Sequence, residues 1–107
     1  MSRPGAIDLT ADERRIVLEV LRAHLPPGIQ VWVFGSRATG RARRYSDLDL
    51  AIDAGRPLTL DDGAELAESF SDSELPYRVD IVDWHAIDDR FREIIAAERR
   101  SLTEGVS

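Results

Sequence analysis

Residues 31–52 decide the fold of this chain, and they read VWVFGSRATGRARRYSDLDLAI. An apolar run ends in a Gly-Ser turn, and a second apolar run begins around Asp47 and Asp49, spaced i and i+2. Because alternate residues of a strand point to one face, these two carboxylates project together, away from the apolar residues between and after them. Two carboxylates about 5 Å apart repel by about 3 kcal/mol at an effective dielectric of about 20. A hard divalent cation is therefore expected between them.

Length and composition indicate an ordinary globular protein. The chain has 107 residues, which predicts a single domain spanning residues 1–107. It has no cysteine, so disulfides, thiolate nucleophiles and cysteine zinc sites are excluded. No apolar stretch is long enough to span a membrane, and the N-terminus lacks the apolar core of a signal peptide. We expect a cytoplasmic protein with no membrane partner.

Charge is distributed unevenly along the chain. The formal net charge of −6 argues against direct binding of nucleic acid, which requires a basic surface. No acid occurs between Glu19 and Asp47, however, and four arginines lie between residues 37 and 44. A local basic segment thus lies beside the Gly-Ser turn and the aspartates. The chain has no lysine, which excludes the lysine of a P-loop.

Local signals predict an alternation of helices and strands. Residues 1–7 are expected to form a flexible arm. Capping, periodicity and Pro/Gly breaks then predict a helix from Thr10 to Pro26, a strand at 30–34, a short helix from 36 to about 41, a strand at 48–53, a helix after Thr59, a strand at 77–82, a helix at about 88–99 and an edge strand or tail at 101–103. This order predicts an α/β (α+β) fold with a small mixed sheet of three to four strands, its helices packed against one face.

A third carboxylate is expected to join the first two. In the strand at 77–82, Asp80 alternates with apolar residues and so points away from the helices, whereas Asp83 would face the opposite way and cap the following turn. Three aspartates on one face suit Mg²⁺, which prefers carboxylate and phosphate oxygens. Paired ions of this kind clamp the attacking and leaving oxygens of a phosphoryl displacement. The alternative is that these carboxylates are solvated, which weighs most for Asp80 because strand register is easily misjudged.

The Gly-Ser turn has the parts of a phosphate-binding loop. Gly35 lets a triphosphate approach the backbone, and Ser36 offers a hydroxyl and an amide. Arg37, with Arg43 and Arg44, could neutralise the remaining phosphate charge. The alternative for Arg41, Arg43 and Arg44 is a solvated loop without substrate contact.

These residues carry a resemblance to a known family. The pattern Gly35-Ser36, nine residues, Ser46-Asp47-Leu48-Asp49, and later Val79-Asp80-Ile81-Val82, resembles the signature of the DNA polymerase β nucleotidyltransferase superfamily. Within it, the short length and the run at residues 35–40 resemble the minimal nucleotidyltransferases (MNT), antitoxins paired with HEPN-domain toxins. The resemblance covers residues 10 to 100 and implies the nucleotidyltransferase fold.

The resemblance also implies a role for each motif residue. Gly35 and Ser36 would hold the β- and γ-phosphates of ATP. Asp47 and Asp49 would bind both of two Mg²⁺ ions. Asp80 would bind the catalytic ion and help to deprotonate the acceptor hydroxyl.

The activity that the resemblance implies is transfer of AMP from ATP to a tyrosine of a HEPN toxin, which silences the toxin. Two alternatives stay open: a non-catalytic antitoxin that neutralises its partner by stoichiometric binding, and a catalytic subunit that modifies a small molecule. Since the chain has no room for an acceptor domain, we expect a partner to supply the acceptor. Self-association or a hetero-oligomer with the toxin is compatible with the sequence.

Overall fold

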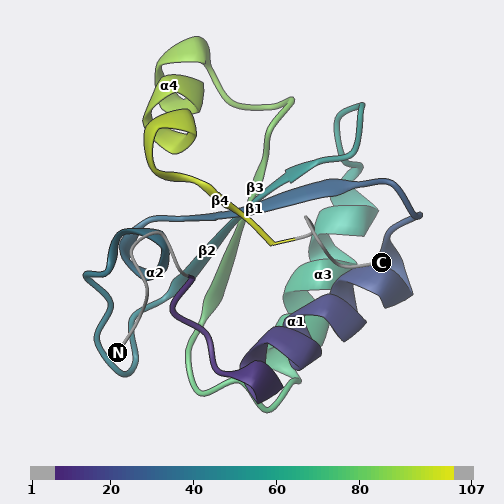
Figure 1. Ribbon diagram of the computed structural model, residues 1–107. Coiled ribbons are helices and arrows are strands. Elements are labelled where there is room, and N and C mark those ends of the chain that lie inside the picture. The colour runs from purple at the N-terminus through teal and green to yellow at the C-terminus, as the bar shows by residue number, and fades with distance from the viewer. Residues whose placement is uncertain (1–6, 103–107) are drawn as a thin grey trace.

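A four-stranded mixed sheet in the order β3-β2-β1-β4 forms the centre of the computed structural model, which describes residues 7–102 (Figure 1). The elements are α1 (Ala11–His24), β1 (Gln30–Phe34), α2 (Ser36–Thr39), β2 (Leu48–Asp53), α3 (Leu60–Ser71), β3 (Val79–Asp83), α4 (Asp89–Glu98) and β4 (Arg100–Ser101). Strand β1 pairs antiparallel with both β2 and β4, while β2 and β3 are parallel. The expected fold class is confirmed.

Side-chain caps fix where the helices begin. Thr10 and Glu13 form a reciprocal capping box at the start of α1, and Thr59 and Asp62 form another at the start of α3. Asp88 accepts a hydrogen bond from a backbone amide of the first turn of α4. These local signals are in the sequence, which is why the positions of the long helices follow from it closely.

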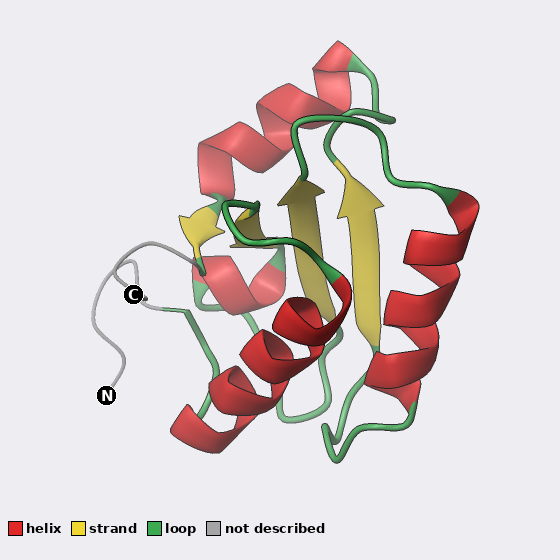
Figure 2. Ribbon diagram, turned by 90° about the vertical axis from the view of Figure 1, so that its right-hand side faces the viewer, coloured by secondary structure: helices red, strands yellow, loops and turns green. Residues whose placement is uncertain are grey.

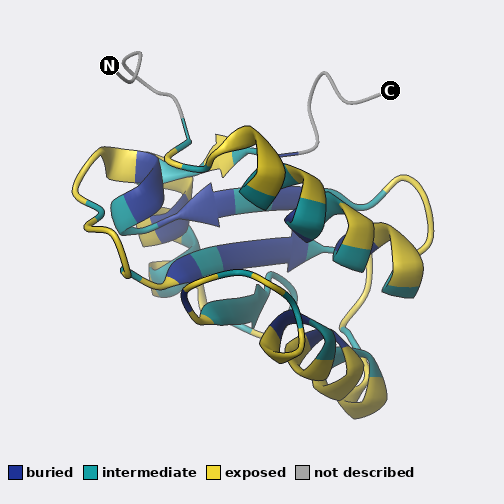
Figure 3. Ribbon diagram, turned by 90° about the horizontal axis from the view of Figure 1, so that it is seen from below, coloured by how far each residue is buried: buried dark blue, intermediate teal, exposed yellow. Residues whose placement is uncertain are grey.

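The sheet buries both of its faces. Helices α1 and α3 lie side by side against one face (Figure 2), over a core that includes Leu48, Leu50 and Ile52. Helix α4 lies on the opposite side of the sheet (Figure 1), where Ile95 packs with Phe34 and Ala51. The central strands β1 and β2 are consequently the most buried (Figure 3).

The position of α4 corrects the expectation that the helices cover one face only. An apolar helix stripe requires burial, but it does not specify which face of the sheet provides it. Aromatic residues of β1 and of the turn after β3 supply the second apolar surface: the rings of Trp32 and Trp84 lie 5.1 Å apart, and those of Phe34 and Phe91 meet edge to face at 6.0 Å.

Smaller differences concern the ends of elements. Strand β3 begins at Val79 rather than residue 77, α2 ends at Thr39 rather than 41, and the edge strand lies at Arg100–Ser101. Of the expected N-terminal arm, Ile7 packs against the core and residues 1–6 lie outside the described residues. Among residues 7–102, none of the helices combines the length and apolarity needed to cross a membrane.

Candidate active site

The Gly-Ser turn at the end of β1 touches the first residues of β2. Gly35 adopts φ +75° and ψ −154°, a conformation that only glycine adopts readily, and its carbonyl accepts the amides of Ala38 and Thr39 to start α2. A Cβ at this position would overlap the Asp49 carboxylate. The turn therefore brings the Gly35 backbone directly against a carboxylate of the neighbouring strand.

The three aspartates expected at the site come together at one end of the sheet. Asp49 of β2 and Asp80 of β3 are register partners, and Asp47 lies one residue before β2. Asp49 and Asp80 lie on the face opposite the α1–α3 core, because the residues beside them, Leu50 and Ile81, belong to that core. Side-chain exposures of 48% for Asp47 and 42% for Asp80 leave both accessible to solvent.

The carboxylates repel each other. Burial raises the pKa of Asp49, and the charges of Asp80, Asp47 and Glu98 raise it further. Arg78 is the nearby cation: its Nε lies 3.4 Å from Asp80 Oδ1 and 4.0 Å from Asp47 Oδ2. Its side chain is 74% exposed, so solvent weakens both ion pairs. Neither of these contacts reaches Asp49, the most buried carboxylate of the set.

Glu98 is a member of this cluster that the sequence did not indicate. It is the last residue of α4, and its Oε1 accepts a hydrogen bond of 2.8 Å from the Gly35 amide. The contact joins residues 63 positions apart. It depends on the packing of α4 on the aspartate face, which is the sheet face that carries Asp49 and Asp80. A glutamate at a helix end gives no local sign of such a contact.

Arg37 has a role different from the expected phosphate contact. Its side chain is 4% exposed, and its guanidinium donates to the carbonyls of Ser46, Asp8, Arg43 and Arg44. It also lies 3.8 Å from the centroid of the Tyr77 ring. These contacts hold the loop between α2 and β2 in place, and they correct the prediction that the Arg37 side chain binds the nucleotide.

The donor set fits a divalent cation. Its members are carboxylate oxygens, the ligands that Mg²⁺ prefers, and the exposed Arg78 compensates their charge only in part. In the described part of the chain, no three carboxylate or imidazole side chains already form a closed ligand set. Asp49 and Asp80 are register partners on neighbouring strands, so their backbones lie only about 5 Å apart.

A groove of about 440 Å³ lies beside Asp80, between β3 and α3. Small residues of α3, Gly63, Ala64 and Ala67, form its helix side. A larger hollow of about 600 Å³ lies between the end of α1 and the start of β1, away from the aspartates. The smaller groove is lined by Val79 and Ile81 on the α3 side of β3, whereas Asp49 and Asp80 lie on the opposite face of the sheet.

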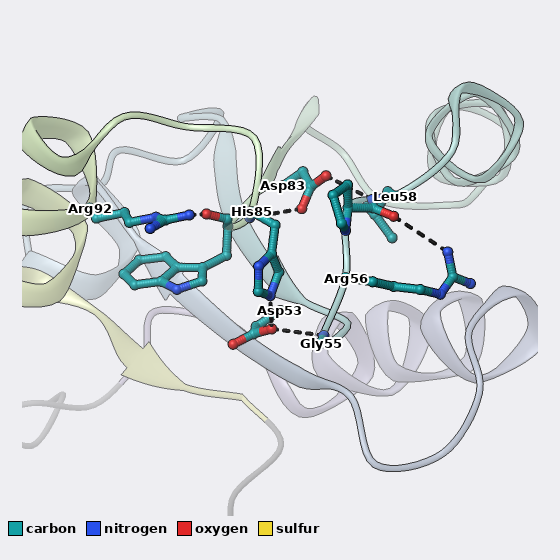
Figure 4. A network of polar contacts seen from close by, with 9 residues as sticks. Asp53, Gly55, Arg56, Leu58, Asp83, His85 and Arg92 are labelled. Carbon is teal, nitrogen blue, oxygen red and sulfur yellow. Dashed lines mark hydrogen bonds and ion pairs between the residues drawn. The ribbon is translucent and has the colours of Figure 1, made fainter.

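A second polar cluster ties together the two loops at the other end of β2 and β3 (Figure 4). A ring nitrogen of His85 lies 2.6 Å from Asp53 Oδ1, which also accepts the Gly55 amide. Asp83 accepts the amides of His85 and Leu58. Asp83 thus caps the turn after β3, as expected.

Comparison with known proteins agrees with this architecture. The family model for the polymerase β nucleotidyltransferase domain matches residues 19–105. The chain therefore belongs to the polymerase β nucleotidyltransferase family and is a nucleotidyltransferase.

Among individual proteins, the chain is similar to the Haemophilus influenzae protein described as "Probable protein adenylyltransferase MntA". The two are 47% identical over 95 residues, covering 89% of this chain and 82% of that protein. A crystal structure of a toxin–antitoxin with AMP-PNP matches with a TM-score of 0.72 and 27% identity, over 83% of this chain and 71% of that one.

An MNT antitoxin in complex with tri-AMPylated HEPN toxin from Shewanella oneidensis has the same fold. It matches with a TM-score of 0.62 and 24% identity, over 83% of this chain and 67% of that one. At this identity the likeness concerns the fold alone.

Proposed function

We propose that this nucleotidyltransferase transfers AMP from ATP to a tyrosine hydroxyl of a HEPN-domain toxin, using two Mg²⁺ ions, and so acts as its antitoxin. The observation that carries the proposal is the cluster of Asp47, Asp49 and Asp80 beside the Gly35 turn, with the pKa of Asp49 raised by burial and by its neighbours. The similarity to MntA supports a protein as the acceptor, and the toxin–antitoxin structure with AMP-PNP supports ATP as the donor.

In this proposal the backbone and hydroxyl of the Gly-Ser turn bind the phosphate tail. Gly35 allows the phosphates to approach because it has no Cβ, and Ser36 donates its hydroxyl. Asp47 and Asp49 would hold both ions, and Asp80 would hold the catalytic ion. When bound, the ions neutralise the triphosphate and stabilise the departing pyrophosphate.

The chemical step exchanges one P–O bond for another. The tyrosine oxygen attacks the α-phosphorus, the bond from that phosphorus to the bridging oxygen of the β-phosphate breaks, and pyrophosphate leaves. Asp80, exposed at the edge strand β3, accepts the tyrosine proton. Most of the catalysis then comes from positioning and charge stabilisation.

The experiment uses the chain with a HEPN-domain toxin as the acceptor and ATP labelled at the α-phosphate. We expect a toxin tyrosine to become labelled. The amount of label should increase with time, and labelling should require Mg²⁺. Asp47→Asn and Asp80→Asn should abolish the label while circular dichroism stays unchanged. Intact label with both variants would contradict the proposal.

Mass spectrometry of the co-expressed partner distinguishes the alternatives. AMP adducts on the toxin support the enzyme. A tightly bound, unmodified toxin would favour stoichiometric neutralisation, and transfer to free hydroxyl compounds by the pair would favour a small-molecule acceptor.

A further inference from the structure

Glu98 occupies an electrostatically unfavourable position. It is the final residue of α4, where the helix dipole already disfavours a carboxylate. Its charge also acts on Asp49 with the same sign as those of Asp47 and Asp80. The hydrogen bond from the Gly35 amide is the compensation that this carboxylate receives at the site.

The packing of α4 keeps Glu98 close to the turn. Ile95, one turn earlier, is fully buried against the aspartate face of the sheet. The next residue, Arg99, stacks over Trp32 with its guanidinium carbon 4.2 Å from the ring centroid. With anchors on both sides, the Glu98 backbone is fixed, and only its side chain is free to leave the Gly35 amide.

One amide cannot serve two anions well. The Gly35 N–H is a single donor, and a carboxylate that accepts it at 2.8 Å fills the direction in which a phosphate oxygen would lie. The space around Gly35 is small. A Cβ on this residue would overlap Asp49, and Glu98 already occupies the position next to its amide. A triphosphate entering this volume would meet the charge of Glu98 at close range.

We propose that Glu98 is an internal competitor of the nucleotide: it holds the Gly35 amide in the nucleotide-free protein, and the phosphate tail of Mg-ATP displaces it. Glu98 is thus a residue of the nucleotide site that lowers the affinity for ATP. This inference rests on the proposed function, because it assumes that the Gly-Ser turn binds phosphate.

The test measures binding of Mg²⁺ with α,β-methylene-ATP by calorimetry, since this analogue cannot be cleaved at the α–β bond. Glu98→Ala should tighten binding about two- to tenfold, the value of one hydrogen bond. Glu98→Gln keeps an oxygen acceptor without the charge, so it should give a smaller gain. Glu93→Ala, an exposed glutamate on the same helix, is the matched control and should change nothing.

A second readout follows the amide itself. In a ¹H–¹⁵N spectrum, the Gly35 proton of the free wild-type protein should resonate downfield and shift upfield in Glu98→Ala. The competitor role alone would be overturned if the wild type binds the analogue and Glu98→Ala binds it no more tightly. It would also be overturned if the Gly35 signal does not move in Glu98→Ala. Failure of every variant to bind the analogue would overturn both this role and the proposed function.

Discussion

Asp49 and Asp80 face each other as register partners on the parallel strands β2 and β3. A pair of like charges at this separation destabilises the sheet that carries it. The chain tolerates the pair because hydrophobic burial on the opposite face, at Leu50 and Ile81, holds both strands in this register.

Asp49→Asn should abolish AMP transfer and yet stabilise the free protein at neutral pH. The pKa of Asp49 is raised above its ordinary value of 3.8, so ionisation costs the folded state free energy as the pH rises through the folded value. The variant's melting temperature should therefore exceed that of the wild type at pH 7, and the gap should close below pH 3.8. Mg²⁺ should raise the melting temperature of the wild type only.

Glu74→Gln serves as the control for this prediction, because it removes an exposed carboxylate outside the cluster. It should leave both the melting temperature and the response to Mg²⁺ nearly unchanged. A wild-type protein more stable than Asp49→Asn at pH 7 would show that the cluster is already compensated.

Gly35→Ala should destabilise the protein by about 1–3 kcal/mol, chiefly because its backbone conformation, φ +75° and ψ −154°, suits only glycine, while the Asp49 carboxylate that it overlaps is the end of a side chain that can move. Gly40→Ala is the matched control: Gly40 has a similar φ of +78°, but open space around its Cβ position, so about 1 kcal/mol is expected. Urea unfolding of both variants measures the difference. Because Gly40 has a ψ of 15° and Gly35 a ψ of −154°, equal losses would mean that neither the backbone conformation of Gly35 nor its contact with Asp49 adds to the cost.

Arg37→Ala should destabilise the fold by about 2–4 kcal/mol, because it removes a buried side chain and leaves several partly buried carbonyls without their donor. Arg37→Lys should recover only part of this, since an ammonium group cannot span the same acceptors. Exposed Arg41→Ala is the control and should be nearly neutral. Urea unfolding gives the stabilities, and nucleotide affinity per folded molecule should stay close to that of the wild type.

The Asp53–His85 pair should make part of the stability depend on acid pH. Burial opposes ionisation of Asp53, but hydrogen bonds from the Gly55 amide and His85 outweigh it and lower its pKa below 3.8. The contribution is therefore present above pH 3.8 and is lost as the pH falls through the folded value. Asp53→Asn should be less stable than the wild type at pH 6, with the difference vanishing in strong acid.

Asp89→Asn, at a fully exposed position of α4, is the control for the acid titration. Its difference from the wild type should not follow the same pH course. A constant penalty for Asp53→Asn down to low pH would show that the pair stabilises the loops without ionisation.

The sequence predicted the elements whose signals are local. Capping boxes at Thr10 and Thr59 placed two long helices, and alternation in β2 placed Asp49 on the face away from the main core. The same alternation in β3 predicted that Asp80 lies on this face too, because the side chains of a strand point to only two faces.

Features set by distant packing were missed. Nothing local indicates that α4 packs on the aspartate face, and without that packing Glu98 has no reason to meet Gly35. The burial of Arg37 was also missed, because it depends on carbonyls from two stretches of chain, at residue 8 and at residues 43–46, which local sequence does not bring together.

The burial of Arg37 has a consequence for genetics. A screen for inactive alleles would recover substitutions at this position together with those at the aspartates, and the motif would suggest a shared defect in substrate handling. Abundance in the cell would separate them, since an allele that loosens the loop lowers the amount of folded protein whereas an aspartate allele does not.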